Sequence, residues 1–319
     1  MEKRKECDRE CIGKYIVIRC LGRGGEGNVY LARDEDLHRL VAVKQVRGGR
    51  ENQCGRENGE ADFLKQLKHP MLPVIYELLW DEGWYLVMEF IQGVTLQDYI
   101  DRNGYVSEEQ ACVWAEQLLD VTEYLHTRKP PVIYRDFKPD NIMVCPDGHL
   151  RMVDFGAAAI RNYGVKDGTV MAMTPGYGAP EQYGRTRSPR EHGPSEEIEE
   201  EIMGKRTYAD ERSDIYALGK VMYYMLTAAD PSKPPYTSLP IRDYQPLVRP
   251  WVERVIRKCI EDDPGKRYQM AEEIRRELHR CGKRRCRRRS SFIRAVEKKV
   301  WLTEESAFEW YCAGKCDKI

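Results

Sequence analysis

The sequence lacks long hydrophobic runs, an excess of either charge and the cysteine spacings of a zinc ribbon. No apolar stretch in its 319 residues approaches the roughly 18 that span a bilayer. The first ten residues are highly charged and no apolar core follows them, so we expect no signal peptide and a cytoplasmic protein. Lys+Arg and Asp+Glu both number 52, which argues against a globally basic, nucleic-acid-binding surface.

The chain has 11 cysteines, an odd number, and no sign of secretion, so a disulfide framework is not expected. Three close pairs are spaced C-x3-C or C-x4-C rather than the tight C-x2-C of zinc ribbons. We therefore predict reduced thiols. The alternative is a metal site built from the last four cysteines, Cys281, Cys286, Cys312 and Cys316.

Residues 1–90 predict short strands, and most of the residues after them predict helices. The strands are rich in Val, Ile and Tyr and are separated by Gly or charge clusters, and one helix is expected among them at 56–68. A capping box from Ser107 to Gln110 predicts the start of a long helix over 107–127. The fold class is therefore α+β, with a small five-stranded β lobe carrying one helix and a larger, mostly helical lobe. The predicted strands are 15–21, 28–33, 40–46, 74–79 and 84–90, and the later helices are 212–228, 249–261 and 269–280.

Residues 21–29 contain the pattern G-x-G-x-x-G-x-V. Alone it is a weak signal, and one alternative is a dinucleotide-binding turn between a strand and a helix. Here a second strand follows, so the glycines predict a hairpin whose backbone N–H groups can approach phosphates closely. Lys44 ends the next strand, within reach of the same phosphates, and needs a carboxylate to hold it. Glu60 on the predicted helix is the favoured partner, with Glu57 as the alternative.

A second group of polar residues lies in the loop after the long helix. Asp136 is followed two residues later by Lys138 and five residues later by Asn141, and Asp154 begins an Asp-Phe-Gly turn. A carboxylate can orient and accept a hydroxyl proton, and a lysine can neutralise phosphoryl charge. Amide and carboxylate oxygens are the ligands that Mg²⁺ prefers.

With these motifs in place, the chain resembles a eukaryotic-type protein kinase, and in detail the bacterial Ser/Thr protein kinases. The resemblance rests on VIYRDFKPDNIMV, MVDFGAAA, TPGYGAPEQYG and RSDIYALGKVMYYML and covers about residues 14–280. It implies the two-lobed kinase fold, with ATP and Mg²⁺ (or Mn²⁺) as cofactors. The implied divisions are an N-terminal extension 1–13, an N-lobe 14–88, a hinge 89–93, a C-lobe 94–280 with a polar insertion 185–206, and a basic tail 281–319.

The resemblance also implies a role for each matching residue. Asp136 is the catalytic carboxylate, with Lys138 and Thr174 beside it, the latter marking Ser/Thr specificity. Asn141 and Asp154 bind the metal, and Lys44 pairs with Glu60. A regulatory spine is implied at Leu64, Ile75, Tyr134 and Phe155, anchored by Asp214. The remaining implied ATP contacts are Leu21, Gly22, Gly24, Gly27, Val29, Ala42, Met88 as gatekeeper, Glu89 and Ile91 in the hinge, and Met143.

The activation segment is implied to end at Glu181, paired with Arg267. Thr169 is the expected autophosphorylation site, and we hypothesise that its phosphate pairs with Arg135. Two positions depart from the usual pattern, because Tyr134 replaces a His and Met173 replaces a Gly.

Two polar segments lie outside the motifs. The insertion 185–206 predicts an inert, solvated loop, and the alternatives are a substrate gate or a segment with autophosphorylation sites at Ser188 and Ser195. Residues 280–319 hold 12 Lys+Arg against 5 Asp+Glu, so the overall neutrality hides a basic tail with a net charge of +7. Such a tail is either simply solvated or contacts an acidic surface, such as an anionic membrane, a nucleic acid, an acidic protein or its own kinase domain.

The sequence therefore predicts an ATP- and Mg²⁺-dependent protein serine/threonine kinase that also phosphorylates itself. Two alternatives are a pseudokinase acting as a binding module and a small-molecule phosphotransferase of related fold. The motifs indicate neither the protein substrate nor an oligomeric state.

Overall fold

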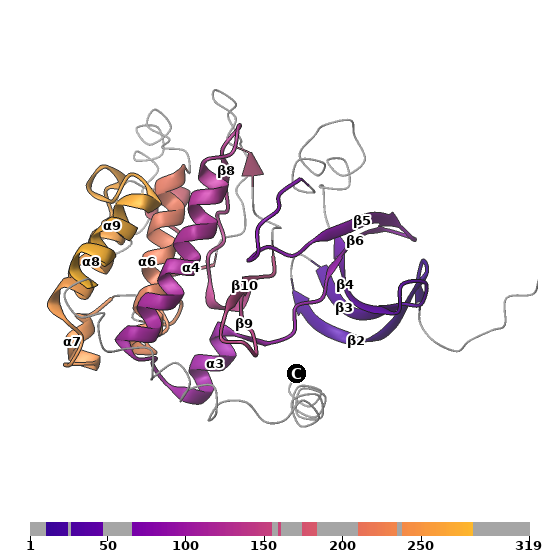
Figure 1. The fold of residues 1–319 in the computed structure, drawn as a ribbon, viewed down its shortest axis with the longest axis horizontal. Helices are drawn as coiled ribbons and strands as arrows, with labels where there is room; N and C mark the ends of the chain where they lie inside the picture. The colour runs from indigo at the N-terminus through magenta and orange to yellow at the C-terminus, as the bar shows by residue number, and fades with distance from the viewer. Residues whose placement is uncertain are drawn as a thin grey trace, which may run out of the picture.

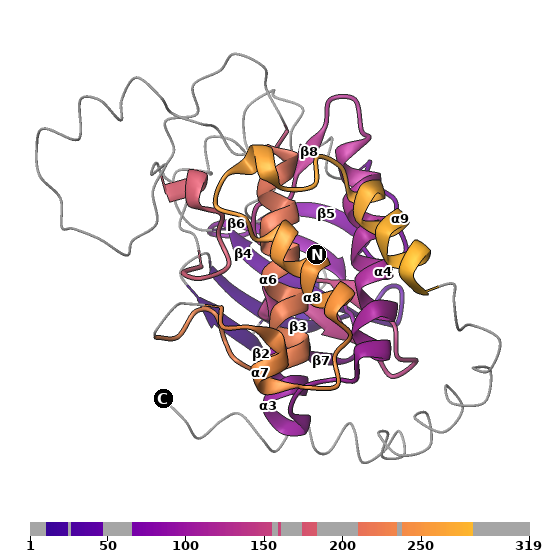
Figure 2. The same cartoon turned by 90° about the vertical axis from the view of Figure 1, so that its left-hand side faces the viewer.

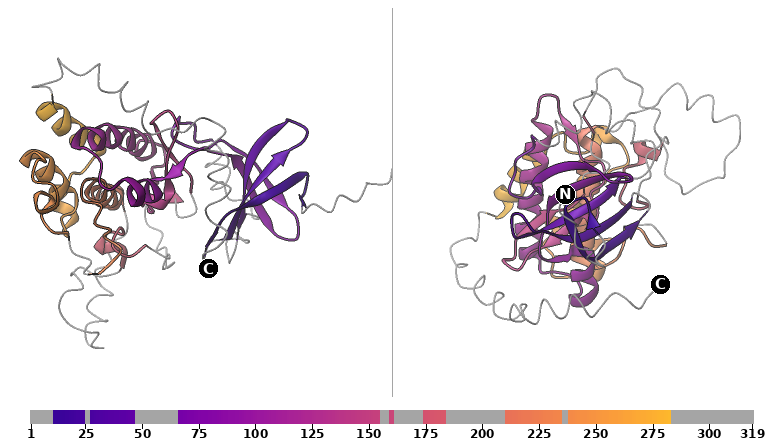
Figure 3. Two further views of the ribbon diagram at one scale, coloured as in Figure 1. Left: turned by 90° about the horizontal axis from the view of Figure 1, so that it is seen from below. Right: turned by 90° about the vertical axis from the view of Figure 1, so that its right-hand side faces the viewer.

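The computed structural model describes residues 11–24, 27–46, 66–154, 159–160, 174–183, 210–234 and 238–282. They form two lobes, a β-sheet followed by a mostly helical region, as predicted (Figure 1). The left-hand view of Figure 3 shows the same separation from below, and its right-hand view looks onto the sheet, with the helical lobe behind it.

The smaller lobe is a six-stranded antiparallel sheet with the order β1-β2-β3-β4-β6-β5. All five predicted strands are confirmed, and the two-residue strand β1 is added at one edge. The strands are β1 (Cys11–Ile12), β2 (Tyr15–Gly24), β3 (Gly27–Asp34), β4 (Arg39–Val46), β5 (Ile75–Trp80) and β6 (Trp84–Glu89).

The sheet curls so that its first strands approach its last. The backbone N–H of Gly13 donates to Asp81 Oδ2 at 2.7 Å, and the Tyr15 hydroxyl donates to Glu77 in β5. Inside this curl lies a small core of buried residues. Its members are Ile12, Tyr15, Ala32, Val41, Val43 and Val87. Most of the predicted helix 56–68 falls outside the described residues, and residues 66–68, which are described, are not helical.

The larger lobe contains every helix that the sequence predicted after residue 100. The Ser107 side chain caps α4 by accepting from the Gln110 N–H at 3.1 Å, as the capping box requires. The sequence missed α3, and between residues 229 and 248 the described residues hold only the four-residue α7. The helices are α3 (Leu96–Asn103), α4 (Glu108–His126), α6 (Glu211–Thr227), α7 (Ile241–Tyr244), α8 (Pro250–Cys259) and α9 (Ala271–Gly282).

Helix α6 is the centre of this lobe. Every residue from Ser213 to Thr227 is buried, as expected for a helix that is covered on all sides. Figure 2 looks onto the helical lobe, where α8 lies over α6 and α9 lies along α4. Among the described residues, no helix is both long enough and apolar enough to cross a membrane.

Short strands connect this core to the loops between the lobes. Strands β7 (Val94–Thr95), β9 (Ile142–Val144) and β10 (Leu150–Met152) form a three-stranded sheet. Strand β8 (Val132–Ile133) pairs with β11 (Ala159–Ile160). The loop from Tyr134 to Asn141 therefore starts at the end of one short strand and ends at the start of another.

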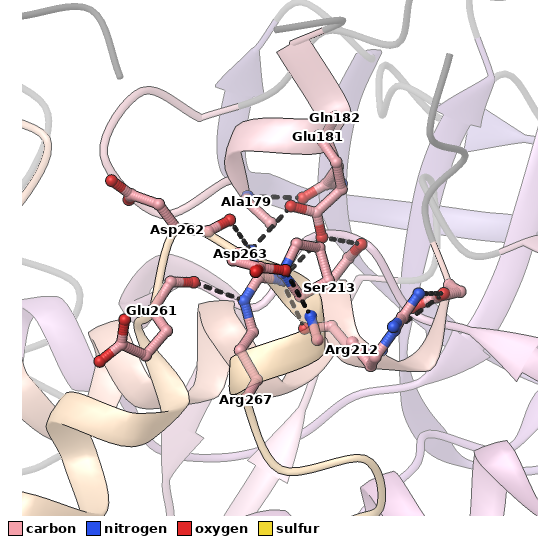
Figure 4. A network of polar contacts seen from close by, with 12 residues as sticks. Ala179, Glu181, Gln182, Arg212, Ser213, Glu261, Asp262, Asp263 and Arg267 are labelled. Atoms are coloured by element: carbon pink, nitrogen blue, oxygen red, sulfur yellow. Dashed lines mark hydrogen bonds and ion pairs between the residues drawn. The ribbon is translucent and has the colours of Figure 1, made fainter. Parts of the chain in front are cut away.

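A buried ion pair joins three distant parts of the chain (Figure 4). Arg267 Nη1 and Nη2 lie 2.7 and 2.8 Å from the two carboxylate oxygens of Glu181, in the turn η2 (Pro180–Tyr183). The Ser213 hydroxyl donates to the same carboxylate at 2.8 Å. The remaining guanidinium N–H groups donate to the backbone carbonyls of Arg212, Glu261 and Asp262, so all five donors of Arg267 are used.

Replacing Arg267 with Met should therefore destabilise the protein strongly. Truncating one partner of a buried pair leaves the other charge buried, at a cost of about 3–5 kcal/mol. The matched control is Arg280→Met, which removes an exposed α9 pair with Glu277 and should cost about 0–1 kcal/mol. Urea denaturation of both variants measures the difference, and equal losses would contradict this view of the Glu181–Arg267 pair.

Candidate active site

The glycine-rich hairpin between β2 and β3 covers one side of the site. Gly27 has φ 133°, and a Cβ there would lie 2.0 Å from the carbonyl oxygen of Gln45 in β4. A side chain is excluded by that close approach. At Gly22 a Cβ would meet no atom within 4 Å, so open space lies beside the backbone there. Leu21 and Gly24 belong to the same hairpin.

Strand register sets the hairpin beside the other predicted ATP contacts. Val29 in β3 lies opposite Lys44 in β4, and Ala42 lies opposite Met88 in β6. Ile91 and Met143 are both buried and pack together with Cys145. The resemblance implies that these residues contact ATP, and that assignment stays a prediction.

Glu89, at the end of β6, is held by its side chain as well as its backbone. Arg151 Nη2 donates to Glu89 Oε2 at 2.6 Å and to the Leu72 carbonyl at 3.1 Å, and the Val74 N–H donates to Glu89 Oε2 at 3.2 Å. Burial opposes ionisation of Glu89, but these hydrogen bonds outweigh it and lower the pKa of the carboxyl. No pattern in the sequence pointed to the contacts of Arg151.

Lys44 reaches across to the larger lobe. Its Nζ atom lies 2.6 Å from both carboxylate oxygens of Asp154, and the residue is only 8% exposed. The predicted partner Glu60 and its alternative Glu57 lie outside the described residues, so that pairing stays a prediction. The lysine predicted to bind phosphate and the carboxylate predicted to bind the metal are thus neighbours.

The loop from Tyr134 to Asn141 and the residue Thr174 bring together the four residues predicted to carry the chemistry. Asp136 Oδ2 lies 2.8 Å from Lys138 Nζ and accepts from Asn141 Nδ2 at 2.7 Å. Lys138 Nζ also donates to the Thr174 hydroxyl at 3.2 Å, which in turn donates to Asp136 Oδ1 at 3.4 Å. A carboxylate, a cation and a hydroxyl therefore converge on one point.

Asp214 in the first turn of α6 holds this loop through hydrogen bonds to its backbone. Its carboxylate accepts from the backbone N–H of Arg135 at 2.7 Å and of Tyr134 at 2.8 Å. His126 Nε2, from the end of α4, lies 2.8 Å from the same carboxylate. Tyr134, fully buried, then donates its hydroxyl to the Asp154 carbonyl at 2.5 Å. The loop and Asp154 are thus connected through the residue that replaces the usual His.

Burial also changes the acidity of the central carboxylate. Desolvation raises the pKa of Asp136, and the nearby Asp154 adds to this. The charge and hydrogen bond of Lys138 and the hydrogen bond from Asn141 act in the opposite direction and do not cancel it. Asp136 is therefore a better proton acceptor than an ordinary exposed aspartate.

The donor set fits a hard divalent cation. The Asn141 amide turns its Nδ2 toward Asp136, also donating to the Asp136 carbonyl at 3.1 Å, which leaves Oδ1 as its ligand atom. An amide oxygen and the Asp154 carboxylate are the oxygen ligands that Mg²⁺ prefers. The alternative cysteine metal site falls on side chains outside those that the structure describes.

Several predicted positions fall outside the described residues. These are Leu64, Phe155, Thr169, Met173 and, in the insertion and the tail, Ser188, Ser195 and the basic cluster after Gly282. The predictions made for them stay predictions.

Comparison with known proteins agrees with this geometry. The family described as protein kinase domain matches residues 15–302. Serine/threonine-protein kinase PrkC of Bacillus subtilis is 30% identical over 282 residues, covering 83% of this chain and 40% of the relative. The probable serine/threonine-protein kinase PknB of Lactococcus lactis is 30% identical, covering 82% and 41%. Sperm motility kinase 2B of Mus musculus is 30% identical, covering 68% and 40%. The chain thus spans about 40% of the length of these relatives.

The raised pKa of Asp136 is directly measurable. In an NMR titration of side-chain carboxyl carbons, with the signal assigned through Asp136→Asn, the midpoint should lie above the ordinary value of about 3.9. Lys138→Met should move it higher still, because Lys138 stabilises the charged form. A midpoint at or below the ordinary value would contradict the role given to burial.

Proposed function

Because this chain belongs to the protein kinase family, we propose that it is an active serine/threonine kinase that transfers the γ-phosphoryl group of ATP to protein hydroxyls. The observation that carries the proposal is the cluster of Asp136, Lys138 and Thr174, joined by contacts of 2.8–3.4 Å. A structural role alone does not require a carboxylate of raised pKa, a half-buried lysine and a hydroxyl within hydrogen-bonding distance of one another.

Each residue of the cluster has a distinct task in this proposal. Asp136 orients the substrate hydroxyl and accepts its proton, for which a raised pKa improves the driving force. Lys138 holds positive charge where the phosphoryl group passes. Thr174 fixes the distance between the two and ties the end of the activation segment to them.

The hairpin, Lys44, Asn141 and Asp154 would hold the nucleotide and its metal. The backbone around Gly22 is open to phosphate oxygens, Gly27 lets the hairpin approach β4 closely, and Lys44 would bind the phosphates directly. Asn141 and Asp154 would supply oxygen ligands to Mg²⁺, or to Mn²⁺. When bound, such a cation neutralises charge on the phosphates. Catalysis would then rest mainly on positioning and charge neutralisation.

Transfer of labelled phosphate from ATP, in the presence of Mg²⁺, tests the proposal. The wild-type protein should phosphorylate itself and a Ser/Thr-containing protein such as casein, with phosphate on Thr169 by mass spectrometry. Asp136→Asn should lose roughly 10²–10⁴-fold in rate, because it cannot accept the proton. Asp147→Asn, in the exposed turn between β9 and β10, is the matched control and should keep full activity.

Two other results of this experiment would each support a different function for the protein. No transfer by either protein while nucleotide still binds would overturn the proposal in favour of a binding module. Transfer to a small molecule but to no protein would favour a metabolite phosphotransferase.

A further inference from the structure

The side chain of Gln182 bridges the turn η2 and the catalytic loop. Its Oε1 accepts from the Ala179 N–H at 2.7 Å, and its Nε2 donates to the Arg135 carbonyl at 3.4 Å. Figure 4 shows Gln182 next to Ala179 on the turn that also carries Glu181. The oxygen of this side-chain amide therefore bonds to the segment that leads into η2, and its nitrogen bonds to the catalytic loop.

The carbonyl of Arg135 is part of the peptide group that precedes Asp136. Arg135 has φ 67°, a left-handed conformation that non-glycine residues rarely adopt because it is energetically unfavourable for them. A residue keeps this conformation only where hydrogen bonds or packing from neighbouring groups hold it. The Arg135 N–H is fixed by Asp214 at 2.7 Å, and its carbonyl is contacted by Gln182.

The peptide group on the other side of Asp136 is held in the same way. The Asp136 carbonyl accepts from Asn141 Nδ2 at 3.1 Å. A side-chain amide therefore donates to each of the two peptide groups that flank the carboxylate. Asn141 belongs to the catalytic motif, whereas Gln182 comes from a segment 47 residues beyond Arg135.

The turn that carries Gln182 is itself firmly anchored. Its neighbour Glu181 is paired with the buried Arg267. On the other side, the Tyr183 hydroxyl donates to the Thr174 carbonyl at 3.3 Å. Three consecutive side chains thus connect to the helical core, the catalytic loop and the segment holding Thr174.

We propose that Gln182 is a positioning residue that sets the peptide plane before Asp136 and couples it to the end of the activation segment. This inference rests on the proposed kinase function for its kinetic consequence, though not for its structural one. The Asp136 carboxylate is aligned with Thr174 only while residues 174–183 keep their contacts with the loop around Asp136. The position of that segment therefore controls the catalytic rate through Gln182.

Two substitutions test the proposal. Gln182→Glu keeps the shape and the acceptor for Ala179 but replaces the donor to Arg135 with an oxygen that repels its carbonyl. Gln182→Met removes both bonds without adding charge. The matched control is Gln245→Glu. Gln245 is 9% exposed, and its Nε2 also donates to a backbone carbonyl, that of Val106, at 3.4 Å, in the helical lobe.

The measurements are kcat, the KM for ATP, and amide hydrogen exchange of a peptide covering residues 132–137. Both Gln182 variants should lower kcat by about tenfold or more with little change in KM, since small misplacements of a reacting group slow catalysis strongly. Exchange in the 132–137 peptide should accelerate. The Gln245 control should change neither, even where it lowers the melting temperature.

The inference is overturned if the Gln182 variants match the Gln245 control in both exchange and kcat. If the wild-type protein transfers no phosphate, the proposed function fails, whereas the exchange comparison still decides whether Gln182 holds the loop.

Discussion

One buried carboxylate holds the catalytic loop in place. Asp214 is fully buried, and its two oxygens contact the N–H groups of Tyr134 and Arg135 and the ring of His126. A buried charge is tolerated only when hydrogen bonds replace the water that it has lost. The dependence is mutual. The Asp214 carboxylate accepts the hydrogen bonds that hold the left-handed turn at Arg135, and the loop supplies the N–H donors that the buried carboxylate requires.

The same first turn of α6 also fixes the end of the activation segment. The Ser213 hydroxyl and the Arg212 carbonyl belong to the network of Glu181 and Arg267, and Asp214 follows directly. Two segments that share the site, one around Asp136 and one from Thr174 to Tyr183, are thus both bonded to the start of one helix, which is buried from Ser213 to Thr227. Their relative position therefore depends on α6 rather than on either loop.

The sequence predicted the elements and the chemistry of the site better than the contacts between them. The five strands follow from Val-, Ile- and Tyr-rich runs, and α4 from its capping box, because both signals are local. Strand β1 has two residues and α3 eight, too short for a periodic pattern. The residues Asp136, Lys138, Asn141 and Asp154 lie in motifs whose spacing is set by the chemistry, so they could be named in advance, and the structure places them together.

The residues that position the motifs were not predictable in the same way. Gln182 and Arg151 act through side-chain hydrogen bonds to groups far away in the sequence, the Arg135 carbonyl 47 residues from Gln182 and the Glu89 carboxylate 62 residues from Arg151. Such contacts leave no pattern in a single sequence, because a glutamine or an arginine at the surface of a helix or turn has the same local signature. The bond between Lys44 and Asp154 likewise required the two lobes to be placed relative to one another.

The most direct test of the dependence on Asp214 is amide hydrogen exchange at Tyr134 and Arg135 in the variant Asp214→Asn. The substitution keeps the volume but replaces one acceptor oxygen with an NH₂ group that faces N–H donors. Protection of the two amides should fall by roughly tenfold or more, equivalent to about 1.4 kcal/mol, whereas Asp210→Asn, which alters the cap of the same helix, should leave them protected. Unchanged protection in Asp214→Asn would contradict the account.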